Sequence, residues 1–300
     1  RPEAVVQLGG SPGSLWSRLA AVVSVTTPIA ERIDVLLPVH ALADRPMLER
    51  AIASVFAQQR PAQTLWVLIN GGLAPERQRL AAALAALAQP QHPTSLQVVE
   101  LEQAGIAAAL NHGLACSDAD WLARLDADDR MLPQRLGQMV RHLQQCRQEG
   151  EPPPDVLGSA VAVLDASGQP LSGQVMRRPR SDQAIRRYLL VGNPFLHPSV
   201  MLRRSLLLAV GGYRSSPGTE DLDLWLRLAS RPGVRFANLA DPLTQYCVRP
   251  GSLSHQADSF LQSALCRLRH CRSPWLAILY GPKIISDLLR YALVRLQRSH

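Results

Sequence analysis

The chain has 300 residues, of which 47% are apolar, and its 32 basic and 24 acidic residues give a formal net charge of +8. This size and composition predict a globular core, and no apolar run reaches the ~18 to 20 residues that a membrane-spanning helix needs. The basic excess comes from scattered arginines without interleaved aromatic residues, so we do not expect a nucleic-acid partner. The five cysteines form an odd set without paired metal-ligand spacing, which indicates a reducing, cytoplasmic compartment.

The first half of the chain alternates strands with helices. Residues 1–32 include a stretch rich in Gly, Ser and Pro, and we expect them to be an extension that precedes the fold. The next elements are predicted from the spacing of apolar residues: strands 33–39, 64–69, 96–101 and 121–125, and helices 46–59, 75–88 and 105–115. This alternation predicts an α/β fold with a mostly parallel, doubly wound sheet. Its ligand crevice should contain the ends of the first and fourth strands.

The second half has a more mixed pattern. The predicted strands are 156–164, which returns as a hairpin, 200–202, and two short strands at 234–239 and 243–248. The predicted helices are one after Leu132-Pro133, one to 190 capped by Ser181, and a short one closed by Gly211-Gly212-Tyr213. A helix at 220–229 capped by Thr219 and C-terminal helices complete the pattern. We therefore expect a smaller, mixed region beside the parallel sheet, followed by a helical tail.

An acidic triplet, Asp126-Ala127-Asp128-Asp129, follows the fourth predicted strand. Three carboxylates at the end of a strand repel one another unless a cation lies among them. Oxygen ligands of this kind suit Mg²⁺ or Mn²⁺, which proteins hold with one or two carboxylates and substrate phosphates. The alternative is a solvated acidic turn in which Asp129 caps the next helix.

Several motifs occur in an order that resembles the family 2 glycosyltransferases of the GT-A fold. They are the strand ending at Pro38, Asn111-x-Gly113, the acidic triplet, Asn193-Pro194 with His197-Pro198-Ser199, Gly211-Gly212-Tyr213, and Glu220-Asp221-x-Asp223-x-Trp225. The resemblance covers residues 33–255. It implies a nucleotide-binding half at 33–130, an acceptor half at 131–255 and an amphipathic helical tail at 256–300. The implied reaction moves a sugar from a nucleotide-diphosphate donor to an acceptor hydroxyl with inversion at the anomeric carbon.

The resemblance assigns the reactive carboxylates. Asp128 would hold the divalent cation that stabilises the departing diphosphate, and Asp126 would contact the ribose or the waters of the ion. Asp221, with Glu220 beside it, matches the base that accepts the proton of the acceptor hydroxyl. The alternative for these two acids is that carboxylates simply favour a helix N-terminus. Asp223 is interpreted differently, as half of an exposed ion pair with Arg227.

Further substrate contacts are implied by position alone. Pro38 and Val39 end the first strand beside the donor, and Trp225 lies on the helix that starts with Asp221. Asn111 falls where the family contacts the donor, although it is also explained as a helix residue close to the cap at Gly113. His197 would face the acceptor, but a lone histidine is more often structural. Arg124 is expected to support the acidic triplet by neutralising charge.

Two positions depart from the family pattern. An acid that recognises the nucleobase usually ends the second strand, whereas this chain has Asn70-Gly71-Gly72, and an amide offers both a donor and an acceptor. Near the end of the domain the family often carries Tyr-Arg-x-His, and this chain has Tyr246-Cys247-Val248-Arg249. We expect Arg249 to bind the diphosphate directly in place of a metal-ligating histidine.

The tail and two other function classes leave alternatives open. Residues 274–297 predict a basic amphipathic helix, which either lies on the inner face of a membrane, close to lipid-linked acceptors, or packs on the domain or a partner. A nucleotidyltransferase would use similar carboxylates, but it usually brings a Gly-rich loop after the first strand, and residues 40–43 contain no glycine. A non-catalytic carbohydrate-binding protein would not need both the metal carboxylates and Asp221.

Overall fold

The computed structural model describes residues 31–216, 218–248, 257–271 and 274–297, and one compact unit begins at Arg32. The predicted extension at 1–32 therefore falls almost entirely outside the described residues. Arg249 lies outside them as well. Within the described residues, no helix combines the length and the hydropathy needed to cross a bilayer.

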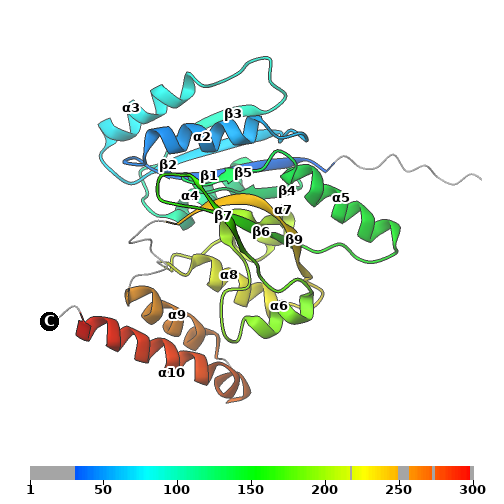
Figure 1. The fold of residues 1–300 in the computed structure, drawn as a ribbon, viewed down its shortest axis with the longest axis vertical. Helices are drawn as coiled ribbons and strands as arrows, with labels where there is room; N and C mark the ends of the chain where they lie inside the picture. The colour runs from blue at the N-terminus through cyan, green and yellow to red at the C-terminus, as the bar shows by residue number, and fades with distance from the viewer. Residues whose placement is uncertain (1–30, 217, 249–256, 272–273, 298–300) are drawn as a thin grey trace, which may run out of the picture. The chain divides into compact units, whose positions relative to one another are not determined.

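The first half of the fold is a parallel sheet with strand order β3-β2-β1-β4 (Figure 1). Its elements are β1 (Ile33–His40), α2 (Arg45–Phe56), β2 (Thr64–Asn70), α3 (Ala74–Ala85), β3 (Ser95–Glu100), α4 (Ile106–Cys116) and β4 (Trp121–Arg124). The chain moves outward from β1 to β3 and then returns to the other side of β1 as β4. The predicted α/β class and the parallel first half are confirmed.

Both faces of this sheet are buried because the strands are apolar on both sides. In β1, Val35 and Leu37 pack with α2, α3 and α5 in one core, whereas Leu36 packs with α4 and α8 in a second core. β1 pairs with β4 only as far as Leu36, but it pairs with β2 as far as His40. The strand was predicted at 33–39 with its hydrogen-bonding run ending at Pro38, but its pairing with β2 continues to His40, while β1 and β4 separate at their carboxyl ends.

The second half extends the same sheet through β8, β6, β9 and β5, in which only the β6 and β9 pair is parallel. Its elements are β5 (Arg130–Met131), α5 (Arg135–Gln148), β6 (Val156–Leu164), β7 (Pro170–Met176), α6 (Asp182–Tyr188), the 3₁₀ turn η1 (His197–Ser199), β8 (Met201–Arg203), α7 (Arg204–Ala209), α8 (Glu220–Ala229) and β9 (Phe236–Cys247). The hairpin of β6 and β7 and the mixed character of this region were predicted.

One strand prediction was wrong. The two short strands expected at 234–239 and 243–248 are a single strand, β9, because β6 pairs with it along its whole length. The pairing register shifts on either side of Ala160, which lies opposite Pro242. The proline disturbs the ladder locally, as a bulge does, without ending the strand.

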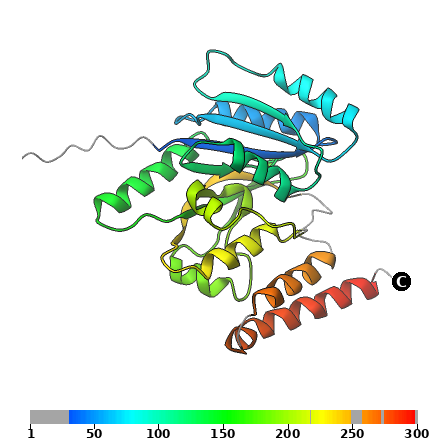
Figure 2. The ribbon, with the colours of Figure 1, turned by 180° about the vertical axis from the view of Figure 1, so that it is seen from behind.

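The C-terminal tail forms two helices, α9 (Ala257–His270) and α10 (Pro274–Gln297). α9 packs against α8, and α10 packs against α9. Figures 1 and 2 show the two helices side by side, with α8 between them and the sheet. The two alternatives concerned residues 274–297, which form α10, and α10 packs on the domain through α9.

Candidate active site

A cleft of about 450 Å³ opens where the carboxyl ends of β1, β2 and β4 meet. This is the place where strand order reverses, and open α/β sheets bind their ligands there. The cleft brings together five residues selected from the sequence: Pro38, Val39, Asn70, Asp126 and Asp128. The predicted meeting of the first and fourth strand ends is thus confirmed.

Among the lining residues to which the sequence reasoning gave no role in the site are His40, Asp44, Gly71 and Gly105. Asp44 accepts a hydrogen bond from the Met47 amide at 2.9 Å and caps α2, a role that its place before Pro46 could have indicated. Gly71 has φ +67, and a Cβ there would come within 2.6 Å of the His40 ring. A side chain at Gly71 would therefore disturb the cleft wall.

The acidic triplet is a compact cluster. Asp126, Asp128 and Asp129 each offer a carboxylate oxygen, and these oxygens lie within 4.8 Å of one another. Asp129 is fully buried; its Oδ1 accepts from the Cys247 amide at 2.8 Å, and its Oδ2 has no partner. Burial and the charges of Asp126 and Asp128 raise the pKa of Asp129 well above its usual value. The alternative role of Asp129 as a helix cap is wrong, because α5 begins at Arg135.

This cluster fits a divalent cation. A buried carboxylate oxygen without a partner costs free energy, and three neighbouring carboxylates add repulsion. A hard cation such as Mg²⁺ or Mn²⁺ bound by these oxygens would remove both costs. Within the described residues, the ligand type, the spacing and the unpaired oxygen of Asp129 all suit such an ion.

Arg124 is the buried counter-charge of the cluster. Its guanidinium forms an ion pair with Asp126, and its positive charge also acts on Asp129. The predicted support of the triplet by Arg124 is thereby confirmed. Asp129 also acts electrostatically on the buried guanidinium of Arg135, but two guanidinium groups do not balance three carboxylates, so an excess of negative charge remains. Arg124 also lowers the pKa of Asp221, so the cluster and the start of α8 share one electrostatic environment.

Asp221 lies in the first turn of α8, where each oxygen of its carboxylate accepts a hydrogen bond. Its Oδ2 accepts from Asn193 Nδ2 at 2.6 Å, and its Oδ1 accepts from the Leu222 amide at 2.7 Å. Burial raises the pKa of Asp221 and outweighs the opposing hydrogen bond from Asn193. Burial and the charge of Asp221 likewise raise the pKa of Glu220. Perturbed carboxyl groups of this kind are typical of acid and base chemistry.

Asp223 differs from our expectation of an exposed ion pair. Its carboxylate is buried and accepts from Arg227 Nε at 2.7 Å and from His270 Nε2 at 3.0 Å. Burial acts to raise the pKa of Asp223, but the hydrogen bonds from His270 and Arg227 prevail and lower it to about 2. The pairing with Arg227 was predicted; its burial and the third partner, on α9, were not. Asp223 therefore joins α8 to the C-terminal helices.

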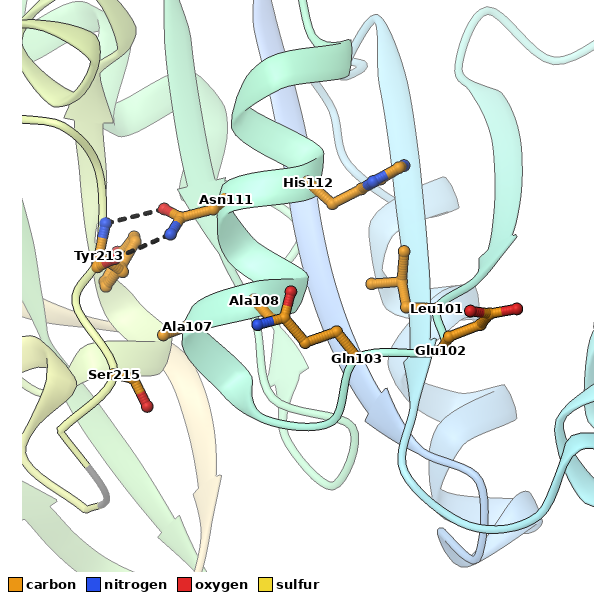
Figure 3. Close-up of a pocket in the computed structure, with 9 residues that line it drawn as sticks. All are labelled: Leu101, Glu102, Gln103, Ala107, Ala108, Asn111, His112, Tyr213 and Ser215. Carbon is orange, nitrogen blue, oxygen red and sulfur yellow. Dashed lines mark hydrogen bonds between the residues drawn. The ribbon is translucent and has the colours of Figure 1, made fainter.

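Two of the predicted substrate contacts are structural. Trp225 is fully buried and packs against Phe195 and His197, so in this conformation its indole cannot contact a sugar. Asn111 donates to the Tyr213 carbonyl and accepts from the Tyr213 amide, both at 2.8 Å. Figure 3 shows this pair of hydrogen bonds joining α4 to the loop after α7. Both polar groups of Asn111 are engaged and serve the fold.

The amide of Asn70 is also engaged, although it lines the cleft. Its Nδ2 donates to the Val39 carbonyl at 3.2 Å, and its Oδ1 accepts from the Gly105 amide at 3.1 Å. An aspartate could not donate to Val39, which explains why this chain departs from the family pattern here. Asn70 therefore fixes the loop before α4, and pairing with a nucleobase is not its role in this conformation.

His197 is partly buried, and its Nε2 lies 3.1 Å from the Tyr213 hydroxyl. Burial and the charge of Arg124 lower the pKa of His197 well below its usual value, so the ring is neutral at pH 7. A second pocket of about 540 Å³ lies on the other side of Tyr213, against α4 (Figure 3). Its lining includes Gln103, His112 and Ser215. None of the reactive carboxylates lines this pocket.

Comparison with known proteins identifies the family. The model of glycosyl transferase family 2 matches residues 34–207. The amylovoran biosynthesis glycosyltransferase AmsE of Erwinia amylovora is 30% identical over 220 residues, which cover 73% of this chain and 76% of that protein. The O-antigen biosynthesis glycosyltransferase WbnJ of Escherichia coli is 26% identical over 246 residues, 80% of this chain and 89% of that one.

Solved structures share the fold. TarS from S. aureus, in complex with UDP-GlcNAc, superposes with a TM-score of 0.60 at 15% identity and covers 84% of this chain and 71% of its own. A mannosyltransferase from Pyrobaculum calidifontis, in complex with GDP-Man and Mn²⁺, gives 0.58 at 18% identity, over 87% and 73% of the two chains. The fold is the GT-A type expected from the sequence, and the chain belongs to glycosyl transferase family 2, whose members are enzymes that transfer sugars.

Proposed function

We propose that the protein is an inverting glycosyltransferase that moves a sugar from a nucleotide-diphosphate donor to an acceptor hydroxyl. The observation that carries this proposal is the pairing of two features. One is an acidic cluster with an unpaired buried oxygen in the strand-end cleft, and the other is Asp221, whose pKa is raised at the start of α8. Family membership favours this reaction over nucleotidyl transfer and over binding without catalysis.

The donor occupies the cleft at the strand ends. Asp128, with Asp126 and Asp129, would hold a divalent cation, Mn²⁺ or Mg²⁺, which when bound would supply positive charge beside the departing diphosphate. The mannosyltransferase structure with GDP-Man and Mn²⁺ supports this arrangement. Pro38 and Val39 form the wall of the cleft toward the nucleoside. Arg249 remains a proposed contact to the diphosphate, on sequence grounds alone.

The acceptor hydroxyl loses its proton to Asp221. Asn193 holds one oxygen of that carboxylate, and the Leu222 amide holds the other, so the orientation of the base is fixed before the acceptor binds. A raised pKa makes Asp221 a stronger base than an exposed aspartate. Glu220 lies in the same turn, and burial and the charge of Asp221 raise its pKa as well.

The acceptor class follows from the relatives. Two of them are named for the biosynthesis of amylovoran and of O-antigen, which favours a glycan, a polysaccharide or a lipid-linked acceptor of the cell envelope. We place the enzyme in the cytoplasm at the inner face of the membrane.

The test is the rate of sugar transfer by Asp221→Asn. This variant keeps an oxygen for the Leu222 amide but accepts no proton, so the rate should fall by ~10²- to 10⁴-fold. Affinity for the nucleotide sugar should change only a few-fold, because the base acts in the transition state. Glu76→Gln, the same change in the first turn of α3, is the control and should keep full activity. Transfer by Asp221→Asn at a near wild-type rate would remove Asp221 from the mechanism.

A further inference from the structure

The outer face of α10 is apolar and exposed. Six large side chains define this face: Trp275, Ile278, Leu279, Ile285, Leu289 and Leu293. Their spacing of three, four or seven residues places them on one stripe of the helix. Trp275 is 76% exposed, and both Ile285 and Leu289 are 60% exposed. Single apolar side chains scattered over a protein surface need no explanation, but six on one stripe of a helix form a contiguous exposed apolar surface.

The opposite face of α10 carries the buried polar group. Asp287 is fully buried, forms ion pairs with Lys283 and Arg267, and accepts from Ser263 at 2.9 Å. Ile284 is the large apolar residue on this inner side. A helix that covers a protein core turns its apolar residues inward and its charged residues outward. In α10 the carboxylate of Asp287 points inward, and the residues of the apolar stripe point to solvent.

We propose that the outer face of α10 binds the surface of an anionic lipid bilayer. Residues 257–297 contain six basic and two acidic residues, and the chain as a whole is positive. Arg290 is exposed beside the apolar stripe, and Arg269 is exposed on α9. Apolar residues with a tryptophan, flanked by basic residues, match the interface of an anionic membrane.

A second copy of the chain fits this face less well. In a symmetric dimer, the same basic helices would meet one another, and their like charges would repel. Anionic lipid instead attracts each exposed arginine. Charge complementarity therefore favours lipid over self-association.

α9 gives this surface a fixed place on the enzyme. His270 on α9 donates to Asp223 on α8, and Arg267 on α9 donates to the Gly192 carbonyl at 3.3 Å. α8 is also the helix that starts with Asp221. A bilayer held by α10 would therefore have a defined orientation relative to the proposed base. The inference concerns where the enzyme is held, so it goes beyond the transfer reaction.

The experiment is co-sedimentation of the full chain with vesicles, either phosphatidylcholine mixed with phosphatidylglycerol or phosphatidylcholine alone. Wild type should bind the anionic vesicles roughly tenfold or more tightly than the neutral ones. Ile285→Gln/Leu289→Gln should weaken anionic binding by roughly tenfold or more, because two apolar side chains no longer enter the interface. Leu73→Gln/Leu208→Gln is the matched control, since Leu73 is 69% and Leu208 47% exposed elsewhere, and it should bind as wild type does.

Three results would overturn the proposal: no binding of wild type to anionic vesicles, equal binding by the two double variants, or a wild-type dimer that Ile285→Gln/Leu289→Gln makes monomeric while vesicle binding stays absent. The last result would assign the face to a second copy. Urea unfolding of both double variants checks that each is folded. Vesicle binding needs no donor or acceptor, so a failure here leaves the proposed transfer reaction untouched.

Discussion

Two groups of buried charges in this protein differ in how far the protein itself supplies partners for their carboxylates. The cluster of Asp126, Asp128 and Asp129 has an ion pair with Arg124 and a charge interaction with buried Arg135, and it leaves a buried oxygen of Asp129 without a hydrogen-bond partner. The group around Asp223 is complete, because Arg227 and His270 each occupy one of its carboxylate oxygens. By type and distance, the three carboxylates of the first group could hold a metal ion, and so could Asp223 and His270 together with Cys266 on α9. In the first group alone, the carboxylates outnumber the guanidinium groups that act on them.

The difference teaches where a ligand is required. Arg227 also donates to the carbonyls of Val210 and Gly212, so the polar atoms that surround Asp223 already have partners. A cation there would compete with a guanidinium that is already in place. The strand-end cluster lies in an open cleft, and it needs a charge that the chain does not supply. A ligand site is thus indicated by an unbalanced group of charges more than by acidity alone.

The largest effect is expected when the complete group is broken. Asp223→Asn removes the charge that balances buried Arg227. The new amide NH₂ group would also face Arg227 or His270, which both donate hydrogen bonds to the present carboxylate. Loss of one partner of a buried ion pair typically costs about 3 to 5 kcal/mol in unfolding free energy. Urea unfolding at neutral pH measures this loss. Glu49→Gln breaks the exposed pair with Arg45 and should cost only about 0.3 to 0.5 kcal/mol. Equal losses for the two variants would contradict the burial of Asp223.

A somewhat smaller effect is expected from acid. The folded pKa of Asp223 is about 2, below the ordinary value of ~3.9, so its ionisation stabilises the fold above pH ~4. This stabilisation is lost as the pH falls from ~4 through 2, and its size is on the order of 2 to 3 kcal/mol. The difference in unfolding free energy between wild type and Asp223→Asn should therefore shrink across that window. A constant difference would show that the pKa of Asp223 is not depressed.

The smallest effect is expected from the same substitution in the other cluster. In metal-free protein, Asp129→Asn removes a buried negative charge that its neighbours oppose and keeps the oxygen that accepts from Cys247. Its unfolding free energy in chelator should stay within about 1 kcal/mol of wild type or rise. A loss as large as that of Asp223→Asn would mean that the protein balances the charge of Asp129 internally.

Sequence patterns predicted the parallel half of the fold because its strands and helices carry strong apolar periodicity and end in turn residues. The cleft residues followed from that order, since strand ends meet at one edge. Asp126, Asp128 and Asn70 were placed correctly in the cleft for this reason. The pairing of Asp223 with Arg227 was also predicted, because residues four positions apart are neighbours on the surface of a helix.

The sequence could not show in the same way which side chains are buried or which of their polar atoms already have hydrogen-bond partners within the protein. The i, i+4 pair of Asp223 and Arg227 has the same spacing whether it faces water or α9, and α9 is distant in sequence. Trp225 was assigned to the substrate because of its position on the same helix as Asp221, and the tertiary packing that buries its indole cannot be read from that position. The engagement of Asn70 and Asn111 depends on loops that approach from elsewhere in the chain.

The central claim is that a divalent cation completes the strand-end cluster and joins the donor diphosphate to it. The most direct measurement is a calorimetric titration of UDP and of GDP into wild type and Asp128→Ala, each with Mn²⁺ and with chelator. Wild type should bind at least one diphosphate roughly tenfold or more tightly with Mn²⁺, and Asp128→Ala should lose that dependence. Asp118→Asn, an exposed carboxylate paired with Arg32, should behave as wild type. The same affinity of wild type with Mn²⁺ and with chelator, or an unchanged Mn²⁺ dependence in Asp128→Ala, would contradict the claim.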